Sequence, residues 1–324
     1  MKSLLARLAK AGIIFMAMAS AASAQQGWPA KPVKVYVGYP AGGLADVMAR
    51  SVAQLMSETL GQPVVVDNKP GANGNLAGEF IAKQPADGYS LCLCSTVIES
   101  VNPFLYEKMG FDPLADVLPA AATGRIQAFL VTKPDFPASK VVDFVAHAKS
   151  RSVPLTYGSA GAGSSPHLLA EMFKRSAGFK ATHIPYKGAA PAIQDLLAGH
   201  VNFMFDPGLS LPHVKAGRLK AYAVVSGSRS ALLPDTPTLA ELGFPGLDYD
   251  TWFALYVRSG TPQAIVNRIN EATNKALADP ALKARYRELG AEPVPMSAAD
   301  IKAIAQRERA AFGPVIRELA IKAD

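Results

Sequence analysis

Hydrophobic positions along the chain follow two alternating patterns. Short β-rich runs are each followed by a segment in which apolar residues recur every three to five positions, as on one face of an amphipathic helix. In the first part of the chain we expect strands at Val33–Gly38, Pro63–Asn68 and Tyr89–Ser95, and helices at Leu44–Leu60 and Gly74–Lys83. Strands that alternate with helices predict a parallel sheet with right-handed crossovers.

The alternation starts again at Ala128. It predicts strands at Ala128–Pro134, Leu155–Ala160, Thr182–Tyr186, Val201–Phe205 and Leu219–Ser226, and helices at Lys140–Lys149, Ser165–Ser176 and Ala189–Ala198. A strand from Trp252 then leads into a long helix that we expect to begin at Pro262, with Thr261 as its N-cap. A last helix is predicted over Ala298–Ile316.

Two α/β lobes follow from this organisation. About 300 residues exceed what one hydrophobic core usually holds. We assign residues 27–127 together with 255–324 to the first lobe and residues 128–254 to the second. Each lobe is expected to be a mainly parallel sheet flanked by helices, and a ligand would bind in the cleft between them, beyond the carboxyl ends of the strands.

Residues 1–24 have the three parts of a secretory signal peptide. Lys2, Arg7 and Lys10 precede an apolar core, and Ala22-Ser23-Ala24 provides small residues at a cleavage site. The alternative is a membrane anchor, but the apolar segment is shorter than the roughly 20 residues that span a bilayer. We therefore expect export with cleavage after Ala24, and no later segment predicts a membrane span.

The net charge of +7 is modest once that segment is set aside. The signal peptide carries three of the positive charges, which leaves 7 − 3 = +4 for the mature chain. Its Lys and Arg residues are scattered and form no basic block with aromatics, so the sequence argues against nucleic-acid binding. A mildly positive field would help to collect acidic solutes.

The two cysteines, Cys92 and Cys94, lie in one predicted strand. Alternate residues of a strand are about 6.5–7 Å apart, too far for ordinary disulfide geometry. We therefore expect buried free thiols rather than a bridge. No third and fourth ligand follow at a recognisable spacing, so we predict no metal site.

Two glycine-rich loops stand between a predicted strand and a predicted helix. The first is Tyr39-Pro40-Ala41-Gly42-Gly43, and the second lies in "YGSAGAGSSPHLLAEMF", which begins at Tyr157. Glycines let backbone N–H groups approach a ligand, and the helix behind each loop adds unpaired N–H groups and a positive dipole end. One such loop is often only a tight turn, but two of them, one in each lobe, would clamp an anion from both sides.

Three side chains near these loops have two interpretations each. Asp46 either stabilises a helix N-terminus by its charge or braces the Gly42-Gly43 amides. His167, expected to be neutral, either contacts the ligand or braces its own loop, and Asp206 either caps a turn or accepts from the ligand.

Nucleotide binding and catalysis lack their signatures. Gly158, Gly161 and Gly163 read G-x-x-G-x-G, not the dinucleotide fingerprint G-x-G-x-x-G, and no phosphate-binding P-loop occurs. There is no G-x-S-x-G nucleophile elbow and no H-E-x-x-H motif, and the five histidines are dispersed. We therefore expect a binding protein without a cofactor, not an enzyme.

Several segments, in one order along the chain, resemble the Bug or TctC-like extracytoplasmic solute receptors of tripartite tricarboxylate transporters. They include "YPAGGLADVMAR", "LGQPVVVDNKPGANGN", "HIPYKGAAPAIQDLLAGHVNFMFD" and "LPDTPTLAELG". The resemblance implies a periplasmic, Venus-flytrap protein, expected to be a monomer, that closes on a small carboxylated solute and serves integral-membrane transporter subunits. A ligand-bound sensor for a signalling membrane protein is the alternative, and a secreted α/β enzyme acting on a carboxylated substrate is a weaker one.

The resemblance also implies where the carboxylate binds. The first loop would contribute Tyr39, Pro40, Ala41, Gly42 and Gly43, with Asp46 behind it. The second would contribute Ser159, Ala160, Gly161, Ala162, Gly163, Ser164 and Ser165, with His167 behind it. Further wall positions would be Ser95, Thr96, Tyr186, Lys187, Gly188 and Asp206. The family's usual Ser or Thr before the first-loop aspartate is Ala45 here, which removes one hydroxyl contact.

Overall fold

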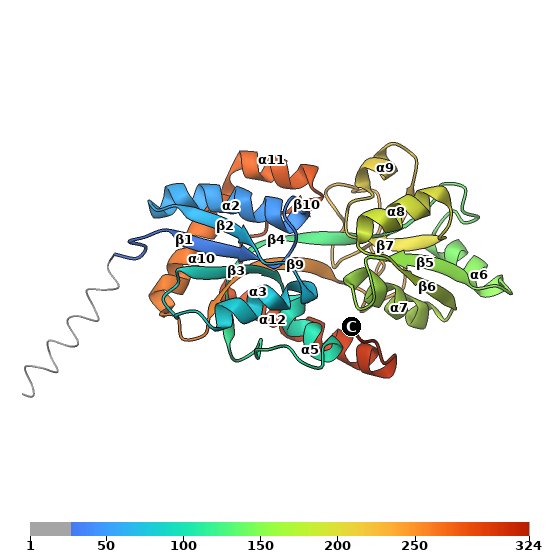
Figure 1. Cartoon of the computed structure of the whole chain (residues 1–324). Coiled ribbons are helices and arrows are strands. Elements are labelled where there is room, and N and C mark those ends of the chain that lie inside the picture. Colours follow the sequence, from blue (N-terminus) through green and yellow to red (C-terminus); the bar gives the residue numbers. More distant parts are fainter. Residues whose placement is uncertain (1–26, 324) are drawn as a thin grey trace, which may run out of the picture.

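The computed structural model describes residues 27–323 as two α/β lobes side by side (Figure 1). The strands are β1 (Val33–Val37), β2 (Val64–Asn68), β3 (Ser90–Ser95), β4 (Val117–Thr132), β5 (Leu155–Ser159), β6 (Ala181–Pro185), β7 (Phe203–Asp206), β8 (Lys220–Val225), β9 (Asp250–Arg258) and β10 (Ala291–Glu292). The signal peptide predicted for residues 1–24 lies outside the described residues.

Helices cover both faces of the sheet. They are α2 (Leu44–Leu60), α3 (Asn75–Ala82), α4 (Val97–Ser100), α5 (Asn102–Leu105), α6 (Val141–Ser150), α7 (Ser165–Ala177), α8 (Ala189–Ala198), α9 (Leu211–Lys215), α10 (Gln263–Ala278), α11 (Pro280–Glu288) and α12 (Ala298–Glu318), with a 3-10 turn, η1 (Ala72–Gly74). None of these helices is long and apolar enough to cross a lipid bilayer.

The strands join in the order β2-β1-β3-β9-β4-β7-β5-β6, and β8 and β10 also pair with β4. Pairing is parallel within β2-β1-β3 and within β6-β5-β7, as the alternation of strands and helices predicts. It is antiparallel wherever β9 or β4 takes part. The fold is thus α/β and two-lobed, with a mixed sheet in place of two mainly parallel ones.

Strand β4 connects the two lobes. Its first part pairs with β9, from Val117 to Gln127, and its last part pairs with β7, from Phe129 to Thr132. We expected a strand only from Ala128, because residues 117–127 are buried on both faces and show no alternation of apolar and polar positions. Where one lobe ends and the other begins along β4 and β9 stays a prediction.

Separate hydrophobic cores support each lobe. Helices α2 and α10 pack on one face of the first lobe, and α3 packs on the other. In the second lobe α6 and α7 cover one face and α8 the other. Helix α12 serves both lobes, because Ile301 joins the core of the first and Phe312 that of the second.

The long helix behind the first loop has the predicted bounds, Leu44–Leu60. Gly61 ends it with a left-handed φ of 69°, a conformation that suits glycine. The cap predicted for the later helix is wrong. Pro262 is the N-cap of α10, and the Thr261 hydroxyl donates instead to the carbonyl of Arg258.

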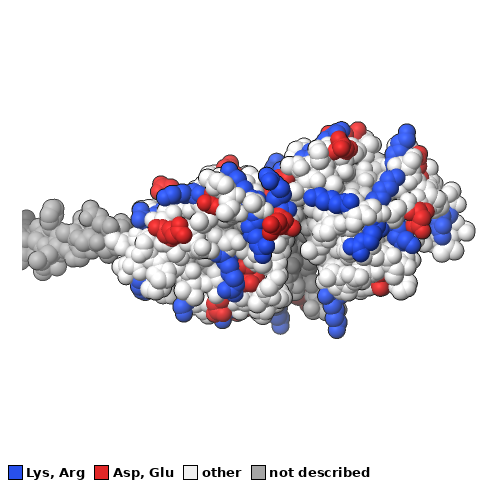
Figure 2. Space-filling model, turned by 90° about the horizontal axis from the view of Figure 1, so that it is seen from above, with Lys and Arg blue, Asp and Glu red and all other residues white. Residues whose placement is uncertain are grey.

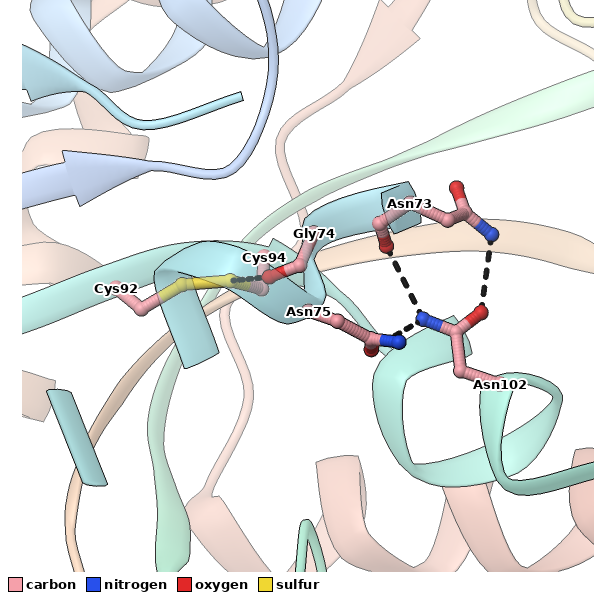
Figure 3. Close-up of a disulfide and its surroundings, with 6 residues drawn as sticks. All are labelled: Asn73, Gly74, Asn75, Cys92, Cys94 and Asn102. Carbon is pink, nitrogen blue, oxygen red and sulfur yellow. Dashed lines mark hydrogen bonds between the residues drawn. A yellow bond between two sulfur atoms is a disulfide. The ribbon is translucent and has the colours of Figure 1, made fainter. Parts of the chain in front are cut away.

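The prediction of free thiols is also wrong, because Cys92 and Cys94 are joined by a disulfide (Figure 3). Their Cα atoms are 5.7 Å apart, closer than in a fully extended strand and within the range that a disulfide spans. Beside the bridge, the Asn102 side chain donates to the Asn73 carbonyl at 3.2 Å and to Asn75 Oδ1 at 2.6 Å, which fixes the η1 turn.

Candidate functional site

A cleft of about 780 Å³ lies between the lobes. Its wall combines the loop between β1 and α2, the start of α7, the segment between β7 and α9, and the end of α11. Ile126 of β4 and Phe253 of β9 also line it, so the strands that connect the lobes contribute to the same wall.

The first glycine loop is held by Asp46. Gly42 N–H donates to Asp46 Oδ2 at 2.9 Å, and Arg50 and Asn68 donate to the same buried carboxylate. Asn68 also donates to the Tyr39 carbonyl at 3.1 Å, so both ends of the loop are tied to one network. Burial raises the pKa of Asp46, but the hydrogen bonds from Arg50, Gly42 and Asn68 outweigh it and hold that pKa below its usual value.

Hydrogen bonds within the first loop occupy its glycine amides, so the amides that face the cleft are those at the start of α2. The N–H of Gly42 is committed to Asp46, and that of Gly43 donates to the Pro40 carbonyl at 3.3 Å. Gly43 is the N-cap of α2, and no described side chain caps this helix. Leu44 and Ala45, its first residues, line the cleft, so the unpaired N–H groups of a 17-residue helix open onto it.

The second loop is built in a parallel way. Gly163 N–H donates to Nδ1 of His167 at 3.0 Å, again a side chain four residues further on. Because Nδ1 accepts, the proton of the neutral ring is on Nε2. Burial lowers the pKa of His167, and the neighbouring Lys174 lowers it further while Glu171 opposes the shift.

A second histidine supports the first. The ring of His183 stacks on His167 with centroids 3.8 Å apart, and its Nε2 lies 2.6 Å from Ser159 Oγ. Burial and the adjacent His167 lower the pKa of His183 to about 4. The Ser159 hydroxyl also forms hydrogen bonds with the Gly161 backbone. Ser159 and the two stacked histidines therefore hold the second loop in place.

Helix α7 also begins at the cleft. The helix begins at Ser165, as the sequence predicts, and Ser164 is its N-cap. The Ser164 hydroxyl donates to the Gly161 carbonyl at 2.7 Å rather than capping the helix. Ser164, Ser165 and Pro166 line the cleft. The two helix N-termini, α2 from one lobe and α7 from the other, therefore border the same cavity.

Asp206 caps a turn. It is fully buried, and its Oδ2 accepts from Gly208 N–H at 2.9 Å and Ser210 N–H at 2.6 Å. Burial raises its pKa to about 6, and the hydrogen bonds from Ser210 and Gly208 oppose that shift. The turn presents Pro207, Gly208 and Leu209 to the cleft in its place.

The Tyr186–Gly188 segment supports the second loop from the side. Tyr186 N–H donates to the Ser159 carbonyl and Gly188 N–H to the Ala160 carbonyl. The Tyr186 hydroxyl donates to Asp195 at 2.6 Å, away from the loop backbone, and Lys187 is exposed.

The structure thus divides the residues that the sequence singled out. Those that line the cleft are Tyr39, Pro40, Gly42, Gly43, Ser95, Ala160, Ser164 and Ser165. Those that do not are Ala41, Asp46, Thr96, Ser159, Gly161, Ala162, Gly163, His167, Tyr186, Lys187, Gly188 and Asp206. Several of the second group hold the first in place.

Sequence reasoning missed much of the remaining wall. The cleft also includes Leu209 and Lys215 of the second lobe and Arg287, Glu288 and Leu289 of the first. No motif marks them, and α9 and α11, which carry or adjoin them, were not predicted. Among residues 27–323 no group of three His, Cys, Asp or Glu side chains is placed to hold a metal ion.

Comparisons with known proteins show the family to which the chain belongs. A family model described as tripartite tricarboxylate transporter family receptor matches residues 48–321. The chain is 35% identical to protein BugT of Bordetella pertussis over 314 residues, 95% of this chain and 96% of BugT. A structure of an R. palustris protein with adipate is similar at 35% identity and a TM-score of 0.79, covering 91% of this chain and 99% of that one.

MatC from Rhodopseudomonas palustris, solved with bound malate, is similar at 29% identity and a TM-score of 0.75, covering 89% of this chain and all of MatC (100%). Two α/β lobes around one cleft define the class of periplasmic binding proteins, to which similar structures such as BugD belong. The chain belongs to the receptor family of the tripartite tricarboxylate transporters, which confirms the resemblance seen in its sequence.

Proposed function

We propose that this protein is a periplasmic receptor that captures a small organic carboxylate between its lobes and delivers it to the integral-membrane subunits of a tripartite tricarboxylate transporter. The observation that carries the proposal is the pair of uncapped helix N-termini, α2 and α7, at one cleft. A carboxylate there would accept from backbone N–H groups of both helices and meet the positive end of each dipole. Closure of the lobes would bring the two sets of donors onto one anion.

The same geometry favours binding over catalysis. Backbone amides neither give nor take a proton at neutral pH. The titratable side chains nearest the loops, Asp46 and His167, are committed to loop amides. The ligands printed for two similar structures, adipate and malate, are carboxylates.

Substitution of Gly43 tests the proposal. Its extended backbone (φ −75°, ψ 170°) suits an N-cap aspartate, so Gly43→Asp would place a carboxylate on the amides of α2. The added Cβ lies 3.2 Å from the Pro40 carbonyl oxygen, a tight contact that the alanine control shares. We expect an unfolding free energy within about 0.5 kcal/mol of wild type, and a loss of affinity of roughly a hundredfold from like-charge repulsion. Gly43→Ala is the control and should keep its affinity within about threefold.

Isothermal titration with adipate, malate, citrate and octanoate provides the readout. If the wild-type protein binds none of them, the receptor proposal fails. If Gly43→Asp binds as wild type does, the assignment of the carboxylate to the start of α2 fails. Delivery is tested separately, by retention of the transporter's membrane subunits on immobilised, ligand-saturated protein, and absence of retention would contradict it.

A further inference from the structure

The cleft wall away from the helix N-termini is mostly apolar. Its apolar members come from both lobes and from the connecting strands: Leu44, Val47, Val97, Ile126, Leu209, Leu211, Phe253 and Leu289. Prolines 40, 166, 207 and 212 add further apolar surface. A ligand that fills this cavity would contact the helix amides and a large hydrocarbon surface.

Leu209 is the clearest example of an exposed apolar side chain on this wall that a bound ligand would bury. Its side chain lies on the turn that Asp206 caps, and 45% of its surface is exposed. A large apolar side chain held in water by a rigid turn gains free energy when a ligand buries it.

Among the described residues that line the cleft, full charges occur only at solvent-exposed positions, which we call the mouth of the cleft. Among the described lining residues, only Lys215, Arg287 and Glu288 carry a charge, and all three are exposed. Lys215 ends α9 of the second lobe and Arg287 lies near the end of α11 of the first, so the two cations stand on opposite lobes. Figure 2 shows Lys and Arg side chains on both sides of the groove between the lobes.

These cations have no ion-pair partner among the described residues, whereas Glu288 is paired with Arg285 at 2.9 Å. A compact polyanion at the helix N-termini would leave its other carboxylates against hydrocarbon, where an unpaired charge is costly. A longer molecule would place a second negative group at the mouth, within reach of Lys215 and Arg287.

We infer that the cleft selects carboxylates with an apolar body, one carboxylate at the starts of α2 and α7 and any second negative group at Lys215 and Arg287. The inference rests on the proposed function and names the ligand class of that same site. It separates extended aliphatic carboxylates from short hydroxylated ones such as malate and citrate.

Titration of the full-length mature protein with octanoate, suberate, malate and citrate tests the ligand class. We expect octanoate and suberate to bind at least tenfold more tightly than malate and citrate. Equal or tighter binding of malate or citrate would overturn the inference and leave the receptor proposal intact. Failure of all four to bind would instead count against the proposed function itself.

Leu209→Ser tests the apolar wall. We expect the affinity for octanoate to fall roughly tenfold, because the ligand loses one apolar contact. Leu114→Ser, a change at a leucine that is 53% exposed outside the cleft, is the matched control and should leave affinity unchanged. Equal affinities of the two variants would contradict the role of the wall.

A double variant, Lys215→Ala with Arg287→Ala, tests the mouth. We expect suberate binding to weaken roughly tenfold while octanoate binding stays within twofold, since only suberate carries the second charge. The control pair is Arg218→Ala with Lys283→Ala, because Arg218 follows α9, Lys283 lies within α11, and neither residue lines the cleft. Unchanged suberate affinity in the first pair would overturn the assignment of the two cations.

Discussion

The two glycine loops are held by hydrogen bonds of the same kind, but the side chains that accept them differ in chemistry. In each, a glycine N–H donates to a side chain four residues further on, Gly42 to Asp46 and Gly163 to His167. The first acceptor is a carboxylate in a network with Arg50, and the second is a neutral imidazole stacked on another histidine. The loops are therefore alike in shape and unlike in their response to mutation and to pH.

The comparison shows that each loop needs a hydrogen-bond acceptor for its glycine N–H, whereas the chemistry of that acceptor varies. A loop that borders an anion site must direct its helix amides outward, so its own glycine amide needs an inward partner. A charged acceptor makes stronger hydrogen bonds but leaves its cationic partner unpaired when it is removed. Removal of a neutral acceptor lowers the unfolding free energy less. An imidazole nitrogen, however, can accept a hydrogen bond only while it is unprotonated.

Removal of the first acceptor should have the largest effect. Asp46→Ala leaves Arg50, Asn68 and Gly42 N–H without their shared partner. The Asp46 side chain is 5% exposed, whereas that of Arg50 is 52% exposed, so water partly solvates the cation that is left. We expect the unfolding free energy to fall by about 2–3 kcal/mol, measured by urea denaturation, together with the affinity for adipate.

Asp67→Ala changes an exposed aspartate in the neighbouring strand and should cost less than about 0.5 kcal/mol. If Asp46→Ala lowers the unfolding free energy by as little as Asp67→Ala does, the first loop keeps its conformation without Asp46.

Removal of the second acceptor should cost less. His167→Ala takes away the partner of Gly163 N–H and the stacking surface of His183, but leaves no charge unpaired. We expect a loss of about 1–2 kcal/mol by the same denaturation measurement. His200→Ala, at a side chain 70% exposed, is the control. A cost equal to that of Asp46→Ala would remove the contrast between the two loops.

Acidification should produce the smallest and most selective effect. The pKa of His183 is lowered from 6.5 to about 4. That depressed value means the neutral ring stabilises the fold above pH 6.5, and this contribution is lost as the pH falls toward 4. The pKa of Asp46 lies below 3.8, so its contribution persists throughout this window and is lost only below it.

Protonation of His167 at Nδ1 would also end its acceptance from Gly163. Hydrogen exchange, compared as the protection of Gly163 relative to Gly42 between pH 6.5 and 4.5, should show the second loop opening first. Glu171 and Lys174 face these histidines. Burial raises the pKa of Glu171, but hydrogen bonds from Lys174 and Tyr157 outweigh it and hold that pKa below its usual value. Simultaneous loss of protection at both glycines would contradict the assignment.

Much of the local structure was predictable because its causes are local. The helix from Leu44 to Leu60 has an unbroken apolar face, and Gly61 supplies the left-handed residue that ends it. The position of both glycine loops, each between a strand and a helix, follows from the same short-range pattern. The choice between a helix-terminus charge and a brace for Asp46 required the structure, as did the choice between a structural role and ligand contact for His167 and Asp206. Each of these side chains had plausible partners for both roles.

The sequence by itself determined the alternation of strands and helices, the two loops and the family. Only the tertiary structure decided that the N-termini of α2 and α7 border one cleft, that Gly42 N–H donates to Asp46, and that Cys92 and Cys94 come within bonding distance. It also decided the apolar wall and the cations at the mouth. Periodicity and caps depend on residues within a turn or two, whereas the cleft joins segments brought together by β4, whose pairing partners lie far along the chain.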